Sequence, residues 1–425
     1  MKSPLCRLKW EHYLAILLPA TAGLAGASGF DVPDQDAFAV ARGTAVTATP
    51  DNPSTIFYNP AGLTQLPGHN FRLGVYGISL EPTYRNPTTG ETFGNRDKLH
   101  ALPHFFYSYG TDWHGLSFGL GVYMPSALGA HWPDGTGFRT LTTKSLLQQV
   151  AITPTVAVKL LDSLSLGAGL AVNYASIDLR QGILWPKDAF DQLRFQGEGW
   201  NVSGNFGLLW QPLEQLSLGA TVDTGTRITV RGNTTAYNNV AFPPGYPFYP
   251  PFSTHSDAHA NLPLPLKAKG GISYRPTPHW NVEFDAEYVD WQALGTITIH
   301  QQSGLPGLLP QDLSTVYDWD ASWYYTLGAT RSFDNGWRVS AGYIFNENSV
   351  PKAHYLPAVA DENRHFFSAG VGRKGKQFDF DVAYQFGWGP ERTITGSDAS
   401  AAGQTADGDY RFLSHAVAVS LGWHF

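Results

Sequence analysis

The C-terminal stretch LSHAVAVSLGWHF, from Leu413 to Phe425, alternates with a period of two. Successive side chains of a strand point to opposite faces, so one face of this segment is broadly apolar and the other is small or polar. A run of about ten residues that carries rings at its end and stops on a phenylalanine is typical of a transmembrane β-barrel strand. A strand of a soluble β-sandwich, which can show the same alternation, is the alternative.

Composition also favours a membrane barrel. Of the 425 residues, 15% are charged and 14% are aromatic, whereas soluble domains carry roughly a quarter charged residues. Beyond the N-terminus, no run approaches the roughly 18 apolar residues that a spanning helix needs. A barrel fits these values because its apolar residues are diluted one in two along each strand. A soluble multidomain protein is the alternative.

Residues 1–27 have the pattern of a secretory signal peptide. Basic residues precede an apolar stretch from Leu14 to Leu24, and the small residues Ala25-Gly26-Ala27 supply a cleavage site. The single cysteine, Cys6, lies in this segment, so we expect neither disulfides nor thiolate chemistry in the mature chain. The mature chain is acidic overall and shows no basic patch, which argues against nucleic acid as a partner.

The rest of the chain divides into two parts. Residues 28–68 are turn-rich and lack the alternation, which indicates a compact non-strand domain. Residues 69–425 contain fourteen candidate strands, an even number as in bacterial barrels, with 214–231, 258–275 and 279–300 each expected as a single strand. Short turns alternate with long loops, as at the periplasmic and extracellular ends of an outer-membrane barrel. Because fourteen strands leave a hole, we expect residues 28–68 to plug it.

Alternation also predicts which residues face the lumen. In 280–288 the rings and aliphatic residues alternate with Asn281, Glu283, Asp285 and Glu287, and in 378–386 the same pattern places Asp381 inward. A charge on the lipid face would cost about 2 to 4 kcal/mol at mid-membrane, so the charged set must face inward. The sequence therefore predicts a polar and partly acidic lumen.

Several motifs along the chain resemble those of one family. Asp36-Ala37 and Ala41-Arg42-Gly43 lead into Pro53-Ser54-Thr55-Ile56-Phe57-Tyr58-Asn59-Pro60-Ala61-Gly62-Leu63, and later matches include Leu262-Pro263, Trp291, Ser349-Val350-Pro351, Asp361 and Arg364. This order is similar to that of the FadL/TodX outer-membrane transporters of long-chain fatty acids and aromatic hydrocarbons. The resemblance implies a 14-stranded antiparallel all-β barrel with an N-terminal hatch. It also implies loop capture of a hydrophobic substrate, an internal site, lateral exit through the third strand, and neither cofactor nor metal.

The segment 242–252 is a candidate substrate-capture loop. Five rings, at Phe242, Tyr246, Phe248, Tyr249 and Phe252, stand among five prolines. They would form a stiff apolar surface on the outer rim, where burying one acyl methylene contributes about 0.8 kcal/mol. A rigid extracellular lid is the alternative.

The third strand is expected to be interrupted at residues 124–129. Pro125 removes a donor from the ladder, and the resemblance places a lateral gate at Pro125, Ala127 and Gly129. An ordinary bulge is the alternative. The resemblance also implies that the Asn59, Pro60 and Ala61 triplet positions the hatch against this gap, although Asn-Pro taken alone is only a turn signal.

A carboxylate head group would need a basic partner inside the barrel. The resemblance suggests Arg180, provided that a bulge near Ser176 and Ile177 turns it inward; pairing with Asp178 at the rim is the alternative. The family's partner lysine is replaced here by Thr298, which leaves room for an uncharged hydrocarbon.

Other function classes are less consistent with the sequence. A general porin would lack residues 28–68. An outer-membrane lipase or protease would need a nucleophile with histidine and acidic partners or a His-Glu-x-x-His motif, and the latter is absent. A structural or adhesin barrel stays open. The expected partners are a hydrophobic small molecule, outer-membrane lipid and the barrel-assembly machinery, the last read from the terminal Phe425, and we expect a monomer in the bacterial outer membrane.

Overall fold

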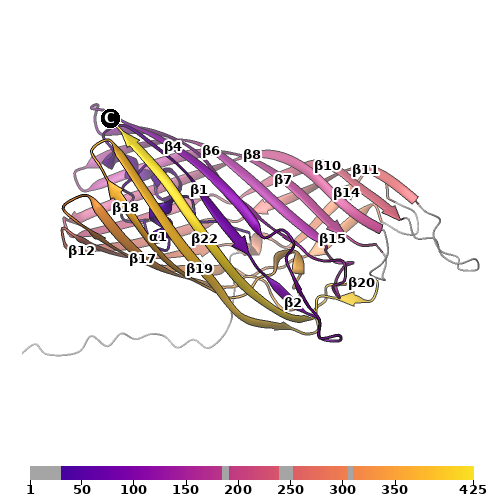
Figure 1. Cartoon of the computed structure of the whole chain (residues 1–425). Coiled ribbons are helices and arrows are strands. Elements are labelled where there is room, and N and C mark those ends of the chain that lie inside the picture. Colours follow the sequence, from indigo (N-terminus) through magenta and orange to yellow (C-terminus); the bar gives the residue numbers. More distant parts are fainter. Residues whose placement is uncertain (1–29, 184–190, 239–251, 305–309) are drawn as a thin grey trace, which may run out of the picture.

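The protein is a closed antiparallel barrel that surrounds a small N-terminal hatch (Figure 1). The computed structural model describes residues 30–183, 191–238, 252–304 and 310–425. The expected signal peptide, 1–27, lies outside the described residues. Fourteen strands form the wall, which confirms the predicted architecture.

The hatch contains three short helical elements and the wall contains most of the strands. The hatch elements are α1 (Ala37–Ala41), α2 (Thr55–Tyr58) and η1 (Pro60–Gln65). The uninterrupted wall strands are β1 (Gly68–Leu80), β4 (Leu99–Gly110), β5 (Leu116–His131), β6 (Lys144–Leu161), β7 (Leu164–Gln181), β8 (Asp191–Leu213), β17 (Trp337–Asn346), β18 (Arg364–Lys374), β19 (Phe378–Ile394) and β22 (Gly408–His424).

The other four wall strands each consist of two elements. In chain order these elements are β9 (Leu216–Asp223) and β10 (Thr226–Asn238), β11 (Phe252–Leu264) and β12 (Lys267–Thr277), β13 (Trp280–Val289) and β14 (Thr296–Gln301), and β15 (Asp312–Val316) and β16 (Ser322–Ser332). Loops add the short strands β2 (Thr83–Arg85), β3 (Thr92–Gly94), β20 (Ser400–Ala401) and β21 (Gln404–Thr405), with η2 (Trp291–Ala293) and η3 (Pro357–Val359).

The predictions of single strands over 214–231, 258–275 and 279–300 were therefore wrong. One break falls at Pro265, which has no N–H to donate to a ladder. Another falls at residues 290–295, where η2 brings Trp291 and Leu294 into the interior, both almost fully buried. At these breaks, backbone and large rings enter the lumen in the half of the barrel that lies on the long-loop side of the hatch.

The C-terminal strand closes the barrel against the first strand. β22 pairs with β1 from Asn70 opposite His424 to Leu80 opposite Ser414, and with β19 on its other side. Closure satisfies the backbone groups of both strands, which an open edge in lipid would leave unpaired.

The alternation of burial confirms the predicted facing. On β22, Val417 and Leu421 are exposed, whereas Ala418 and Ser420 are buried. On β13, Phe284 faces outward and Glu283 and Asp285 are almost completely buried. The apolar residues of the wall thus face the bilayer.

The two ends of the barrel differ. Short turns such as 162–163 and 214–215 occupy the end that holds both the C-terminus and the start of β1, and long loops occupy the other end. Outer-membrane barrels have their short turns on the periplasmic side.

Within the described residues, no helix is long and apolar enough to cross a membrane. The hatch helix α1 lies inside the barrel (Figure 1) and packs mainly on β18 and β19.

Candidate functional site

A buried ionic network fastens the hatch to the wall. Asp36 caps α1 by accepting hydrogen bonds from the backbone N–H groups of Phe38 and Ala39, at 3.0 and 3.3 Å. The same carboxylate pairs with Arg72 of β1 at 2.5 Å, and Arg72 also pairs with Asp381 of β19 at 2.7 Å. Burial alone would raise the pKa of Asp36, but the Arg72 guanidinium outweighs burial and lowers that pKa. The capping carboxylate therefore stays charged.

The acidic residues predicted to face the lumen hold the hatch backbone. The N–H groups of Val46 and Thr47 donate to Asp285 Oδ2, each at 3.1 Å, and the N–H of Ala48 donates to Glu283 Oε1 at 2.6 Å. Arg42 of the hatch pairs with Glu283 at 3.1 Å. These inward carboxylates are used for docking the hatch, so they do not form a polar pore.

The Asn59-Pro60-Ala61 triplet docks on β7 and β8. Asn59 Nδ2 donates to the carbonyl oxygens of Thr47 at 2.7 Å and Leu208 of β8 at 3.1 Å. A Cβ added to Gly207 of β8 would overlap Asn59 Oδ1 and lie 2.7 Å from Pro60 Cδ. The close approach of the triplet to the wall is provided by Gly207 of β8 and Gly167 of β7. That the triplet positions the hatch against the gap in the third strand stays a prediction.

The third strand, β5, has a bulge at the expected place. Tyr123 pairs with Ala151 of β6 and Ser126 pairs with Gln149, so Met124 and Pro125 together oppose one residue. Beyond the bulge, Ala127 and Gly129 pair with Gln148 and Leu146 of β6.

The pairing of β5 with its other neighbour, β4, stops early. The β4–β5 ladder runs from Gly110 opposite Ser117 to Phe105 opposite Val122. Beyond this point, residues 99–104 of β4 are paired only with β1, on their other side, and residues 126–131 of β5 are paired only with β6. No ladder joins these two stretches to each other in the described chain. The far end is bridged by the N–H of Arg96, which donates to the His131 carbonyl at 2.8 Å. A window in the backbone ladder therefore lies between β4 and β5.

The start of the hatch lines the β5 side of this window. Asp31 forms a β-bridge with Ser126, and the N–H of Val32 donates to the Pro125 carbonyl at 2.9 Å. Gln35 Nε2 donates to the Met124 carbonyl at 2.8 Å. Ala127 packs in the same buried cluster as Val32 and α1. Residues 31–35 thus satisfy the backbone groups that the bulge exposes toward the lumen.

An apolar cavity lies inside the barrel, on the long-loop side of the hatch. It encloses about 120 Å³. Its lining comes from six wall strands, three connecting segments (290–295, 317–321 and 347–363) and the first described residue of the hatch, and includes Phe30, Leu147, Ile177, Leu179, Phe195, Leu262, Ile297, Ile299, Tyr317, Trp319 and Val359. Phe30 packs edge-on against Trp291, with ring centroids 4.9 Å apart. Phe30 lines the cavity, and the next two residues, Asp31 and Val32, line the window. One continuous segment of the hatch therefore joins the cavity to the window.

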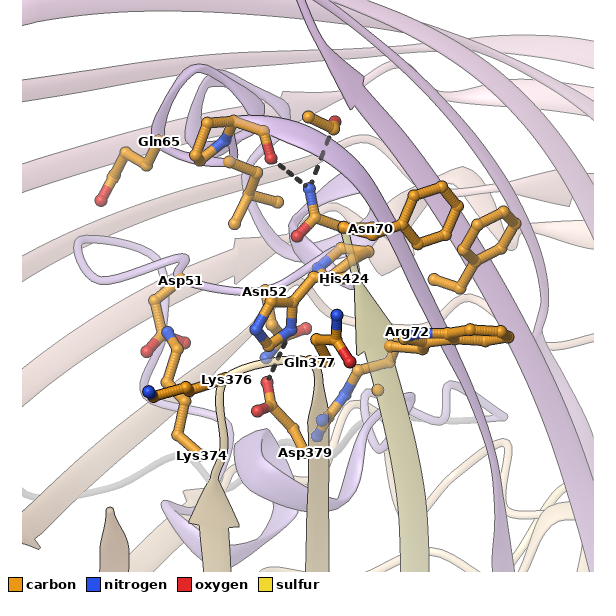
Figure 2. Close-up of a pocket in the computed structure, with 18 residues that line it drawn as sticks. Asp51, Asn52, Gln65, Asn70, Arg72, Lys374, Lys376, Gln377, Asp379 and His424 are labelled. Atoms are coloured by element: carbon orange, nitrogen blue, oxygen red, sulfur yellow. Dashed lines mark hydrogen bonds and ion pairs between the residues drawn. The ribbon is translucent and has the colours of Figure 1, made fainter. Parts of the chain in front are cut away.

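A second, larger pocket lies at the short-turn end and has a different character (Figure 2). It encloses about 680 Å³ between the hatch and the last strands, and Lys374, Lys376 and Asp51 line it. Figure 2 shows His424 turned toward Asp379, at 3.8 Å. Charged walls keep their water, so this pocket does not suit an apolar ligand. The Phe30 cavity is therefore the candidate binding site.

The chain matches a known family model over residues 18–425, described as outer membrane protein transport protein (OMPP1/FadL/TodX). The chain belongs to this family. It is an outer-membrane transport barrel for hydrophobic compounds and not an enzyme.

Solved structures with the same fold share little sequence with this family member. A Pseudomonas aeruginosa FadL homologue has a TM-score of 0.80 at 18% identity, covering 94% of this chain and 100% of the other. The Pseudomonas putida toluene transporter TodX has a TM-score of 0.74 at 16% identity, covering 94% and 100%. The Ralstonia pickettii toluene transporter TbuX has a TM-score of 0.69 at 17% identity, covering 92% and 98%. These likenesses concern the fold.

One curated protein is related in sequence over part of its length. A putative outer membrane protein of Neisseria meningitidis serogroup B is 34% identical over 122 residues. The match spans 26% of this chain and about a quarter of the relative.

In this FadL/TodX family member, Arg180 faces away from the lumen. The register of β7 runs without a shift from Asn173 to Gln181 against β8, so the bulge expected near Ser176 is absent. Ile177 and Leu179 line the cavity, and Arg180 projects to the opposite face. There it pairs with Asp178 at 2.6 Å. The prediction that Arg180 contacts a head group inside the barrel was wrong, and the rim ion pair is what the structure has.

The capture-loop residues Phe242, Tyr246, Phe248 and Tyr249 lie outside the described residues. Phe252 begins β11, where it pairs with Asn238 of β10. The capture role of this loop stays a prediction from the sequence.

Sequence reasoning missed the apolar lining of the cavity. A signal was present in β7, where the inward positions change from Ser165, Gly167 and Asn173 to Ile177 and Leu179. Phe30 gave no comparable signal, because it lies outside the alternating segments.

Proposed function

We propose that this barrel takes up a hydrophobic small molecule passively, by capture at loop 242–252, binding in the Phe30 cavity and lateral exit between β4 and β5. The observation that carries the proposal is the unpaired window, lined by hatch residues 31–35 and continuous along the chain with the cavity wall. Lateral exit suits an apolar molecule, because it passes from one apolar environment to another without entering water.

The alternative route through the barrel axis is opposed by the way in which the hatch is held. Arg72 of β1 and Glu283 and Asp285 of β13 fix it through buried charged groups on two strands. Breaking one buried ion pair by removing a partner costs about 3 to 5 kcal/mol. Residues 31–35, by contrast, contact β5 mainly through hydrogen bonds to its backbone. Elsewhere on the wall, Asp31 pairs with Lys267 of β12 at 2.7 Å, and Asp34 accepts a hydrogen bond from Gln385 of β19 at 3.0 Å. Their displacement is the less costly opening. The same anchored hatch argues against a general porin.

A reversible lock tests lateral exit. Asp31 and Ser126 are directly bridged, and bridged antiparallel partners have Cα atoms within the range that a disulfide spans. The only native cysteine, Cys6, lies in the predicted signal peptide, so we expect the mature D31C/S126C variant to carry a single cysteine pair. We expect uptake of radiolabelled toluene and oleate by a complemented deletion strain to fall when the pair is oxidised and to recover on reduction.

The matched control is V339C/V371C. These residues face lipid and oppose one another on β17 and β18, which are already fully paired. Its uptake should not respond to oxidation. Equal uptake by oxidised and reduced D31C/S126C would overturn lateral exit past residues 31–35.

Capture by the loop has its own test. Deleting residues 242–252 should lower uptake at low external concentrations of substrate, because fewer molecules are collected at the rim, and should have little effect at saturating concentrations. Unchanged uptake at low concentration would contradict the capture role.

The same proposal includes that the protein is a monomer and that it associates with outer-membrane lipid and with the barrel-assembly machinery.

A further inference from the structure

A small polar cavity adjoins the window. It encloses about 80 Å³ between the hatch and the wall, and Asp31, Pro125, Asp223 and Lys267 are among the residues that line it. Asp31 and Pro125 belong to the window, whereas Asp223 ends β9 and Lys267 begins β12. The segment that closes the window therefore shares a cavity with charged groups from another part of the wall.

Lys267 holds the window segment of the hatch. Its ammonium group pairs with the Asp31 carboxylate at 2.7 Å, and the two side chains are only 20% and 10% exposed. Asp31 also forms the bridge to Ser126 of β5, so the residue that Lys267 binds is the one that closes the window. The next inward lysine of β12, Lys269, has its own partner in Glu287 at 3.3 Å. Lys267 is therefore the cation that fixes this segment.

Asp223 is a second carboxylate within reach of Lys267. The two residues are directly opposite in the β9–β12 ladder, and both line the cavity, so their side chains point to the same face. The Cβ atoms of such a pair lie about 4.5 to 5.5 Å apart, a separation that a lysine side chain spans. Among the described residues, Asp223 makes neither a hydrogen bond nor an ion pair. One ammonium group thus has two carboxylates beside it and pairs with that of the hatch.

We infer that opening of the window exchanges the Asp31–Lys267 ion pair for an Asp223–Lys267 ion pair. The inference rests on the proposed lateral exit and names the groups that control it. Separating Asp31 from Lys267 without this exchange would leave a largely buried ammonium group unpaired, which is costly. With the exchange, Lys267 stays paired while Asp31 leaves with the hatch segment. The cavity is polar and large enough to admit water, which can hydrate the released carboxylate.

Asp223 is therefore a positioning residue that acts on the window through Lys267, and hydrogen exchange tests this role. The N–H of Val32 donates to the Pro125 carbonyl at 2.9 Å, so it exchanges with deuterium when the segment leaves β5. The exchange rate of this amide, corrected for intrinsic rates, is measured by mass spectrometry on the protein in lipid nanodiscs. D223N removes the second partner of Lys267, so exchange should slow by about tenfold, as loss of one charge-assisted hydrogen bond from the open state provides. A substitution that merely loosened the wall would speed exchange instead.

Two further variants assign the effect to the shared lysine. D31N removes the partner in the hatch, so Lys267 pairs with Asp223 whether the window is open or closed, and exchange should speed up. Adding D223N to D31N should no longer slow exchange, because the two carboxylates have ceased to compete. D257N is the matched control: Asp257 of β11 is exposed and does not line the cavity, so exchange should stay at the wild-type rate.

The outcomes separate this inference from the proposed function. Heat-shifted migration on gels verifies that each barrel is assembled. If D223N exchanges as fast as the wild type or faster, or slows exchange equally in the D31N background, the inference fails and lateral exit stands. Unchanged exchange in D31N also overturns it, even if D223N does not assemble. The disulfide lock between residues 31 and 126 tests lateral exit separately, and if that lock leaves uptake unchanged, control of transport by Asp223 fails as well.

Discussion

Replacing Arg72 by methionine should release the hatch. Arg72 is 1% exposed and is shared by Asp36 of the hatch and Asp381 of β19. R72M keeps an apolar stem but leaves Asp36 buried without its cation in the docked state, whereas Asp381 keeps its pair with Arg338 at 2.7 Å. Loss of one partner of a buried ion pair costs about 3 to 5 kcal/mol. In the undocked state water reaches the Asp36 carboxylate, so this cost falls mainly on docking. The undocked fraction should rise by roughly two to four orders of magnitude.

Single-channel conductance in planar bilayers measures this effect. The wild-type protein should be closed to ions, because the hatch fills the lumen, whereas R72M should show frequent openings. R331M is the control, since Arg331 is exposed on the outer face over the Trp280 ring, with 5.5 Å to its centroid. Heat-shifted migration on gels verifies that each barrel is assembled. If assembled R72M is as closed as R331M, Arg72 does not hold the hatch and the ionic-anchor argument is wrong.

Two further predictions concern the hatch motif and a loop carboxylate. G207A should lower hydrophobic uptake while the barrel stays heat-resistant, because its Cβ overlaps Asn59; G270A, whose Cβ meets nothing within 4 Å, should not. Glu362, in the loop before β18, is buried, and burial raises its pKa from 4.5 to about 8. The stability that this group contributes is therefore complete below about pH 4.5 and is lost as the pH rises through about 8. Hydrogen exchange of loop 347–363, corrected for intrinsic rates, should speed up over that range, and E362Q should remove the change; a persisting pH dependence would point to another group.

The binding site was only partly accessible to sequence reasoning. The bulge at Pro125 follows from a missing N–H, and the sequence located it correctly. The predicted facing of Arg180 was wrong because it assumed a bulge in β7. A single bulge reverses the facing of every later side chain on a strand, and β7 has no bulge there. The docking of Asn59 on β8 depends on Gly207, some 150 residues away in the chain. No local pattern carries that information.

The sequence by itself determined the wall. Alternation is a local property of each strand, and the cost of a charge in lipid decides which set of residues faces inward, so the run from Leu413 to Phe425 was enough to indicate a barrel. Only the tertiary structure decided what the wall encloses. Contacts such as Asp36 with Asp381 through Arg72, or Phe30 with Trp291, join segments that are brought together by the curvature and closure of fourteen strands. Those contacts separate the anchored part of the hatch from the segment at the window, and they depend on geometry that period-two patterning does not encode.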